Sequence, residues 1–102
     1  MKQEGTRMSR MYNPPHPGRI LKDAIINIPM SVTEFAGHIG VGRVTLSRVI
    51  NQKAGITARL SMRISEAFGQ SPDLWFRMQS AYDFWAASQE KRQKVKQLKA
   101  AA

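Results

Sequence analysis

Apolar residues recur along the chain at the three- and four-residue spacing of helix faces, and alternating strand-like runs are almost absent. The first such face lies in residues 17–27 and consists of Ile20, Leu21, Ala24 and Ile25. The preceding prolines lack amide donors and cannot lie inside a helix, so Pro17 is expected at the first position of this one. Pro29 then closes the segment.

The second predicted helix has the most clearly marked start. Ser31 and Glu34 have the spacing of a capping box, in which the serine hydroxyl accepts the Glu34 amide and the glutamate reaches back to the Ser31 amide. Met30 and Phe35 have the spacing of a hydrophobic staple. We therefore expect a helix from Ser31 to about Ile39.

The second and third helices have the residue pattern of a helix-turn-helix unit. Gly40 permits the left-handed turn that ends a helix, and only Val41 and Gly42 separate it from a third helix over residues 43–51. Such a unit requires a small residue where the helices cross, a glycine in the turn and apolar residues elsewhere. These positions are filled by Phe35, Ala36, Ile39, Gly40, Val41, Leu46 and Val49. The complete match favours a helix-turn-helix over an ordinary helical hairpin.

Two further helices follow. Thr57 is the expected cap of a helix that runs to Phe68, with an apolar face of Leu60, Ile64, Ala67 and Phe68. The last helix is expected to have Ser71 as its cap and Pro72 at its first position, and to fray after Glu90. The side chains expected to complete the core are Leu74, Met78 and Trp85. The chain is thus predicted to be all-α, with five helices.

Length and composition suit one globular domain. The chain has 102 residues, 42% of them apolar and 23% charged. We expect a flexible extension over residues 1–12, a domain over residues 13–90 and a basic tail over residues 91–102. No segment is apolar enough for a membrane span or a secretory signal. The chain has no cysteine, which excludes disulfides and thiolate metal sites and fits a reducing, cytoplasmic location.

The positive charge is unevenly distributed. Sixteen lysine and arginine residues against seven acidic ones give a net charge of +9. The tail, which we interpret as a solvated helix end with a phosphate or membrane contact as alternatives, holds five basic residues and no acid. Inside the nearly neutral domain, residues 43–65 contain no carboxylate but hold Arg43, Arg48, Lys53, Arg59 and Arg63. A local basic segment of this kind indicates a polyanionic partner.

The third helix is the candidate for reading DNA, because the N-terminal residues of a recognition helix meet base edges in the major groove. Leu46, Val49 and Ile50 are expected to face the core. The side chains expected to read bases are Arg43, Val44, Ser47 and Arg48. Those expected to contact phosphates are Ser31, Thr45, Asn51 and Lys53.

The last predicted helix carries more aromatic side chains than one side of a helix can bury. Phe76, Tyr82 and Phe84 are expected to leave an apolar surface for a partner. A second copy of the chain is the simplest partner, because helix-turn-helix proteins commonly bind palindromes as dimers with recognition helices about 34 Å apart. The sequence therefore predicts a homodimer.

No converging set of reactive groups is found. His16 lies among prolines, His38 is expected on the exposed side of the second helix, and neither has a partner at metal-ligand spacing. The carboxylates are scattered: Glu34 is explained by capping, and Asp83 is expected to bond to a neighbouring helix. We expect no enzyme activity, no metal site and no cofactor.

Two stretches resemble known families. Residues 30–51, MSVTEFAGHIGVGRVTLSRVIN, are similar to the helix-turn-helix of the phage-repressor (Xre) family. Residues 55–85, GITARLSMRISEAFGQSPDLWFRMQSAYDFW, resemble the HigA-type antitoxins, also called virulence-associated protein I, at Ser71, Pro72, Trp75, Gln79, Tyr82, Asp83 and Trp85. With the leading NPPHPGRIL, the resemblance covers about residues 13–86.

This resemblance implies a lambda-repressor-like domain of five helices with an extended C-terminal helix. It implies a homodimer that represses its own operon from a palindromic operator in double-stranded DNA. It also implies the antitoxin of a type II toxin–antitoxin module, bound to a RelE-like ribonuclease toxin. Such a protein would be cytoplasmic and associated with the nucleoid through DNA.

The sequence departs from the family pattern at two places. Gly42 stands where a serine or threonine cap is common, which removes one phosphate contact, and the basic tail lies outside the shared pattern. Two other functions remain open at this point. One is a stand-alone Xre-type regulator without a toxin, and the other is a helical protein–protein adaptor.

Overall fold

The computed structural model describes residues 13–99, which form five helices and no strand. The helices are α2 (Pro17–Ile26), α3 (Val32–Ile39), α4 (Arg43–Ile50), α5 (Ala58–Phe68) and α6 (Leu74–Ser88). The predicted all-α fold and its five helices are confirmed. The predicted extension over residues 1–12 and the last three residues of the tail lie outside the described residues.

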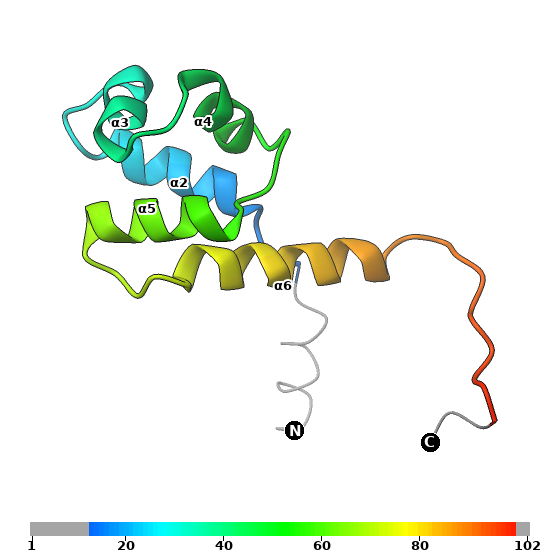
Figure 1. Ribbon diagram of the computed structural model, residues 1–102. Helices are drawn as coiled ribbons and strands as arrows, with labels where there is room; N and C mark the ends of the chain where they lie inside the picture. Colours follow the sequence, from blue (N-terminus) through cyan, green and yellow to red (C-terminus); the bar gives the residue numbers. More distant parts are fainter. Residues whose placement is uncertain (1–12, 100–102) are drawn as a thin grey trace, which may run out of the picture.

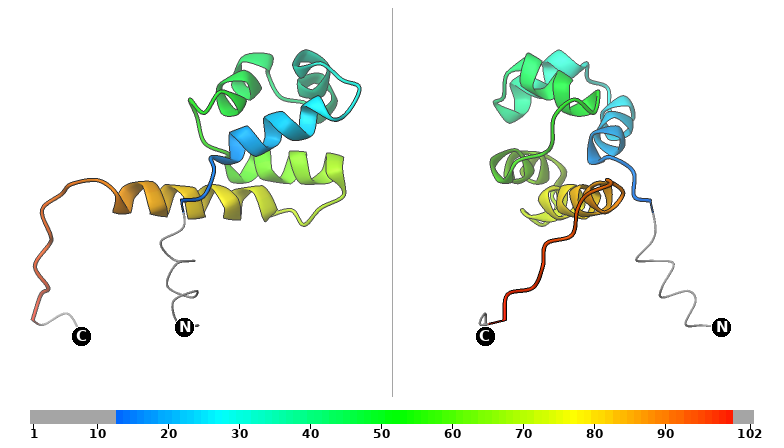
Figure 2. Two further views of the ribbon diagram at one scale, coloured as in Figure 1. Left: turned by 180° about the vertical axis from the view of Figure 1, so that it is seen from behind. Right: turned by 90° about the vertical axis from the view of Figure 1, so that its right-hand side faces the viewer.

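The helices are arranged around one core, with the short ones stacked on the longer ones. Helices α3 and α4 lie together at one end, α2 lies behind them, and α5 separates them from α6 (Figure 1). The views in Figure 2 show α6 projecting beyond the end of α5, followed by the chain of residues 91–98, which has no regular secondary structure. The main packing pairs are α5 with α6, α2 with α4 and α3 with α4, and α2 also contacts α6, as α3 contacts α5.

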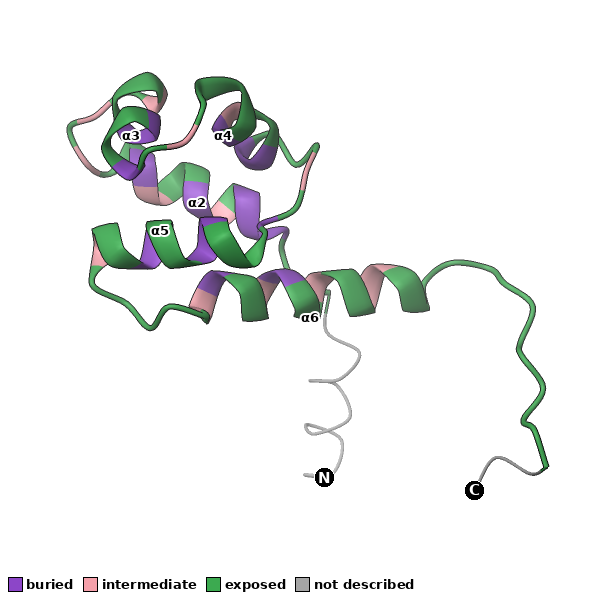
Figure 3. Ribbon diagram, in the orientation of Figure 1, coloured by how far each residue is buried: buried purple, intermediate pink, exposed green. Residues whose placement is uncertain are grey.

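Side chains from all five helices and from the loop before α5 form the core (Figure 3). Its members are Leu21, Ile25, Phe35, Ala36, Ile39, Leu46, Val49, Ile50, Ile56, Leu60, Ile64 and Trp75. On α6, Leu74 and Met78 are half-buried and pack against the core, as predicted. The prediction was wrong for Trp85, which is half-buried without packing against the core, and it omitted Trp75, which is buried in it. On α5, Ala67 is exposed, and Ser61 and Ser65 are buried beside Leu60 and Ile64. The buried face of α5 is therefore displaced around the helix from the apolar stripe that the sequence predicted.

Most helix ends follow their sequence signals. Both hydrogen bonds of the capping box at Ser31 are present, and Thr57 accepts the Leu60 amide at 3.2 Å. Pro17 occupies the first turn of α2, as predicted. Gly40 ends α3 with a left-handed backbone, φ +72°. These local interactions fix where the chain turns before any tertiary contact is considered.

The predicted start of α6 was wrong. The helix begins at Leu74 rather than Pro72, because residues 71–73 form a turn closed by the bond from the Leu74 amide to the Ser71 carbonyl, 3.1 Å. The amide of Phe76 is instead capped from another helix: it donates to Ser61 Oγ at 3.0 Å, and Ser61 Oγ donates to the Pro72 carbonyl at 2.7 Å. The first turn of α6 is therefore stabilised by α5.

Within residues 13–99, no helix has the length and apolar content that crossing a membrane would need.

Candidate nucleic-acid interface

Helix α4 presents one buried face and one open face. Leu46, Val49 and Ile50 are buried, as predicted, and hold the helix on the core. On the outer side Val44 is 70% exposed, and Arg43 and Arg48 are also exposed. Ser47 is half-buried. The structure thus places the predicted base-reading residues on the outward side of α4.

Arg43 is held in position by a neighbour that the sequence analysis did not identify. Its Nε donates to Thr33 Oγ1 on α3 at 2.8 Å. This bond uses the inner nitrogen of the guanidinium and leaves the terminal nitrogens outside it, the arrangement needed for paired donation to a guanine edge. A side-chain bond between residues ten positions apart has no periodic signal, so the sequence could not reveal it.

The C-terminal turn of α4 is closed by its own polar side chains. Asn51 Nδ2 donates to the Ser47 carbonyl at 2.8 Å, and Arg48 Nη2 donates to the Lys53 carbonyl at 3.0 Å. The side chains of Ser47, Arg48, Asn51 and Lys53 line one surface depression of about 500 Å³. Two residues predicted to read bases and two predicted to contact phosphates therefore meet at one place.

The other two predicted phosphate contacts lie on separate elements. Ser31 is exposed, accepts the Glu34 amide at 3.1 Å and donates its own amide to Glu34 Oε1 at 2.8 Å. Its hydroxyl keeps a proton for an outside acceptor. Thr45 is exposed on α4. The site is thus assembled from α3, α4 and the loop that follows α4.

Neighbouring elements hold α4 and the turn before it. At Gly18 the first turn of α2 lies so close to α4 that a Cβ would overlap the Val49 carbonyl oxygen. On the other side, Arg63 of α5 donates through Nη1 to the Ile39 carbonyl at 2.9 Å, next to Gly40. Helices α2 and α5 therefore fix the angle at which α4 is presented.

A polar cluster that the sequence analysis missed is formed by two buried side chains, His16 and Gln79, and by the exposed Asp83. Gln79, 5% exposed, accepts the Ile56 amide at 2.9 Å and donates to Asp83 Oδ1 at 2.9 Å. The prediction that Asp83 bonds to a neighbouring helix was wrong, because the hydrogen bond that it accepts comes from Gln79 on the same helix, α6. The only prior sign in the sequence was that Gln79 and Asp83, four positions apart, share one face of the last predicted helix.

His16 belongs to this cluster and is a structural residue. Its ring is buried, packs edge-on against Tyr82 with ring centres 4.8 Å apart, and accepts the Gly18 amide at Nδ1 at 2.9 Å. Burial lowers the pKa of His16, and the Asp83 carboxylate opposes that shift. The neutral ring therefore caps α2, whereas His38 is exposed on α3 as predicted.

The predicted partner residues divide into two groups. Phe84 is 77% exposed and Phe76 is 42% exposed, both on α6. Tyr82 is half-buried between His16 and Trp85. The open apolar surface of α6 thus centres on the two phenylalanines, which lie eight residues apart on one side of the helix.

Histidine and acidic side chains do not form a metal site in the described part of the chain. No group of three or more histidine, cysteine, aspartate or glutamate side chains lies close enough together there to hold a metal ion. The recorded ion pair joins Arg77 and Asp73 at 2.8 Å, on α6. Within residues 13–99, the basic side chains around α4 form no ion pair with a carboxylate.

Comparison with known proteins agrees with this architecture. The helix-turn-helix family model matches residues 26–75. Virulence-associated protein A' of Dichelobacter nodosus is 38% identical over 90 residues, 87% of this chain and 78% of that protein. An addiction module antidote protein of a HigA family from Coxiella burnetii has 31% identity and a TM-score of 0.68, covering 74% of this chain and 84% of that one. The antitoxin HigA of Pseudomonas aeruginosa, solved with the higBA promoter, has 29% identity and a TM-score of 0.69, covering 72% and 82%.

The five helices and the outward-facing α4 define a helix-turn-helix regulator of the phage-repressor type. The chain belongs to the helix-turn-helix family that contains the virulence-associated proteins and the HigA-type antitoxins. This is a family of DNA-binding regulators and antitoxins rather than of enzymes, in agreement with the sequence analysis.

Proposed function

We propose that this protein is a sequence-specific DNA-binding repressor that acts as the antitoxin of a type II toxin–antitoxin module. The observation that carries the proposal is the open face of α4, where Arg43 and Val44 project from a helix-turn-helix. The similarity to Pseudomonas aeruginosa HigA, solved with its promoter, supports the same use of this face. The antidote protein of the HigA family from Coxiella burnetii supports the antitoxin role.

In this proposal α4 lies in the major groove with its N-terminus toward the bases. Arg43, whose Nε is bonded to Thr33, donates hydrogen bonds from its two terminal nitrogens to the edge of a guanine. Val44 contacts a thymine methyl group. Ser47 and Arg48 read bases further along the helix. The phosphates on either side are contacted by Ser31, Thr45, Asn51 and Lys53.

Two substitutions separate base reading from phosphate contact. Arg43→Ala is expected to lose affinity for the DNA upstream of the gene by a factor corresponding to about 1–3 kcal/mol, with little change on random DNA. Lys53→Ala is expected to weaken binding to both DNAs and to reduce the salt slope by about 1. Fluorescence anisotropy titrations at several salt concentrations measure both effects. An equal loss on both DNAs for Arg43→Ala would contradict its base-reading role.

The antitoxin role is tested by growth. In this proposal the partner is a RelE-like ribonuclease encoded next to this gene, and the protein represses the operon that encodes both. Inducing the adjacent reading frame alone is expected to arrest growth, and co-expression of this chain is expected to restore it. No arrest, or arrest without rescue, would leave a stand-alone regulator, whereas absence of any DNA preference would favour the adaptor.

We further propose that the protein binds a palindromic operator as a homodimer, with Phe76, Tyr82 and Phe84 at or beside the contact between copies. The exposure of Phe76 and Phe84 on α6 supports this surface. A DNA-binding protein of this kind would work in the bacterial cytoplasm, on the nucleoid.

A further inference from the structure

A cavity of about 280 Å³ lies between α4 and α5, beside the proposed recognition face. Its inner wall is apolar and includes the buried side chains of Val49 and Leu60, with Ala54 at one end. Thr45 and Arg48 line it from α4, and Arg59 lines it from the first turn of α5. Its volume is close to the lower limit of small-ligand pockets, which suits a compact molecule of one or two rings.

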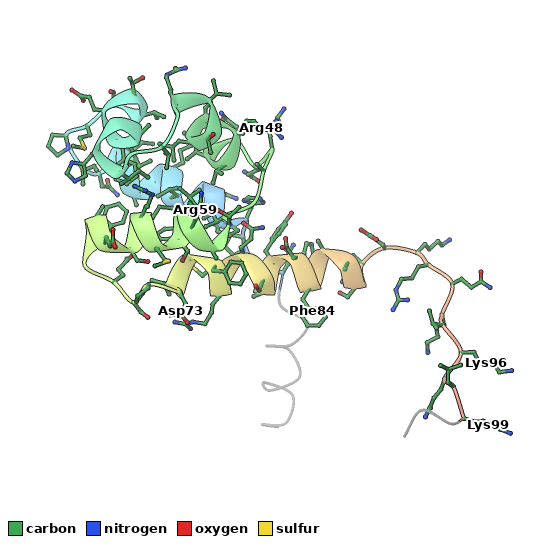
Figure 4. All side chains as sticks on the ribbon, viewed as in Figure 1. Arg48, Arg59, Asp73, Phe84, Lys96 and Lys99 are labelled. Carbon is green, nitrogen blue, oxygen red and sulfur yellow. The ribbon has the colours of Figure 1, made fainter. Side chains whose placement is uncertain are left out.

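The cavity is positively charged, since the two arginines line it and no carboxylate does. Arg48 donates a hydrogen bond from Nη2 to the Lys53 carbonyl, which leaves its other N–H groups outside that bond. Within residues 13–99, the side chain of Arg59 forms no hydrogen bond and no ion pair, and it is exposed. Figure 4 labels both arginines, on the two helices between which the cavity lies.

We propose that this cavity binds a small organic anion with an apolar ring body and one carboxylate. The rings lie against Val49 and Leu60, and the carboxylate accepts hydrogen bonds from Arg59 and Arg48. Guanidinium groups suit this task because their planar donors match a carboxylate in pairs. An apolar wall with two charged donors at its edge is the usual composition of a small-molecule site.

Binding of such an anion lowers the affinity of the protein for DNA. This second part rests on the proposed function, in which Arg48 and Thr45 face DNA. A carboxylate on Arg48 occupies donors that the bases would use and places a negative charge close to the phosphates. Because coupling between two ligands is reciprocal, DNA weakens binding of the anion by the same factor.

The anion site is tested on the free protein by calorimetry, with 2-naphthoate as the probe and uncharged 2-naphthamide as its isostere. The wild-type protein is expected to bind 2-naphthoate at least about tenfold more tightly than 2-naphthamide. Arg59→Ala is expected to lose about that factor for 2-naphthoate. Ala54→Leu, which adds three carbons at the cavity wall, is expected to lose both ligands. Arg19→Ala, at an exposed arginine of α2, is the matched control and should bind like the wild type.

The coupling is measured separately, by anisotropy with the DNA upstream of the gene. At a concentration that saturates the wild type, 2-naphthoate is expected to raise the Kd of the wild type for DNA, but to leave the Kd of Arg59→Ala at the value that this variant has without the anion. Failure to bind DNA in the absence of 2-naphthoate would overturn the proposed function and leave the calorimetric result standing. Absence of 2-naphthoate binding, or equal binding by Arg59→Ala, would overturn the anion site. A loss of DNA affinity in Arg59→Ala with unchanged 2-naphthoate binding would overturn it too, because Arg59 would then contact phosphate.

Discussion

At the residue scale, Gly18 and Gly37 are two helical glycines in opposite surroundings. A methyl group at Gly18 would overlap the Val49 carbonyl, which belongs to the backbone of α4 and cannot turn aside. At Gly37, in the middle of α3, the same methyl group would meet no atom within 4 Å. One position therefore requires glycine for close approach, and the other does not.

Gly18→Ala is accordingly expected to lower the free energy of unfolding by about 2 kcal/mol or more, because α2 must move off α4. Gly37→Ala should raise it by roughly 0.5–1 kcal/mol, since alanine is the better helix former. Urea denaturation of the two variants measures both values. If Gly18→Ala proved as stable as the wild type, the close contact between the helices would be refuted.

His16 gives the stability a pH dependence. Its pKa is lowered in the folded protein, chiefly by burial, so the unfolded chain binds the proton more tightly. Its contribution to stability is fully present above the unfolded pKa of about 6.5 and is lost as the pH falls through the folded pKa.

We expect His16→Asn, which can still accept the Gly18 amide, to lose less stability than the wild type between about pH 7 and about pH 5. His38→Asn, at the exposed histidine of α3, should keep the wild-type dependence. Denaturation at the two pH values gives the comparison. The same dependence in the wild type and in His16→Asn would show that another group titrates.

The sequence predicts single residues well where the interaction is local. Ser31, Gly40 and Thr57 act on amides or torsion angles within a few positions of themselves, so a pattern of residue types is enough to find them. His16 and Thr33 were missed because their roles depend on Tyr82 and Arg43, which the fold brings near them. A residue whose partner is distant in the sequence leaves no periodic signal.

At the scale of elements, α5 carries two buried serines, of which one forms hydrogen bonds to α6 and the residues before it and the other forms none within residues 13–99. Ser61 bonds to both the Pro72 carbonyl and the Phe76 amide and thereby caps α6. Ser65, one turn later, is also buried, and its hydroxyl has no hydrogen-bond partner within the described residues. The sequence did not predict the burial of either serine, because a polar residue type is ordinarily expected on the exposed side of a helix.

Ser61→Ala is expected to destabilise the protein by about 1–3 kcal/mol, because it leaves a carbonyl and a helix-end amide without their partner. Ser65→Ala should be neutral or stabilising, because it removes a buried hydroxyl that forms no bond. Thermal unfolding of both variants tests the pair. Equal losses would mean that the hydroxyl of Ser61 contributes nothing beyond its volume.

At the scale of the whole molecule, the helix-turn-helix pattern predicted the outward face of α4, and it also predicted which side of α4 packs on the core. It could not predict the orientation of α6, since Trp75 and Gln79 rather than Leu74 and Trp85 are buried there. Aromatic residues lie on every side of α6, so its apolar pattern does not select a face. The contact with α5 makes that selection.

The exposed phenylalanines of α6 predict how the proposed homodimer can be disrupted. Phe84→Ser is expected to shift the protein from dimer to monomer at micromolar concentration without loss of helix content, because a central aromatic anchor dominates such contacts. Ile26→Ser, at an apolar side chain of α2 that is 67% exposed, is the matched control and should remain a dimer. Sedimentation velocity and circular dichroism measure the two properties. If the wild-type protein is a monomer at micromolar concentration, the proposed homodimer is wrong.

Helix α6 is 15 residues long, about 22 Å, and none of its residues beyond Gln79 is buried. If two copies meet through Phe84, the part of α6 after Gln79 sets the distance between their α4 helices. Seven residues added to α6 before Phe84, about two turns, would lengthen the helix by about 10 Å and keep the Phe84 side chain on nearly the same face. One added residue would instead rotate Phe84 around the helix by about 100°. Two paralogues with identical α4 helices could then recognise operators with different spacing between half-sites. Each paralogue would then repress only its own operon because of the length of its α6, and not because of a different contact to the bases.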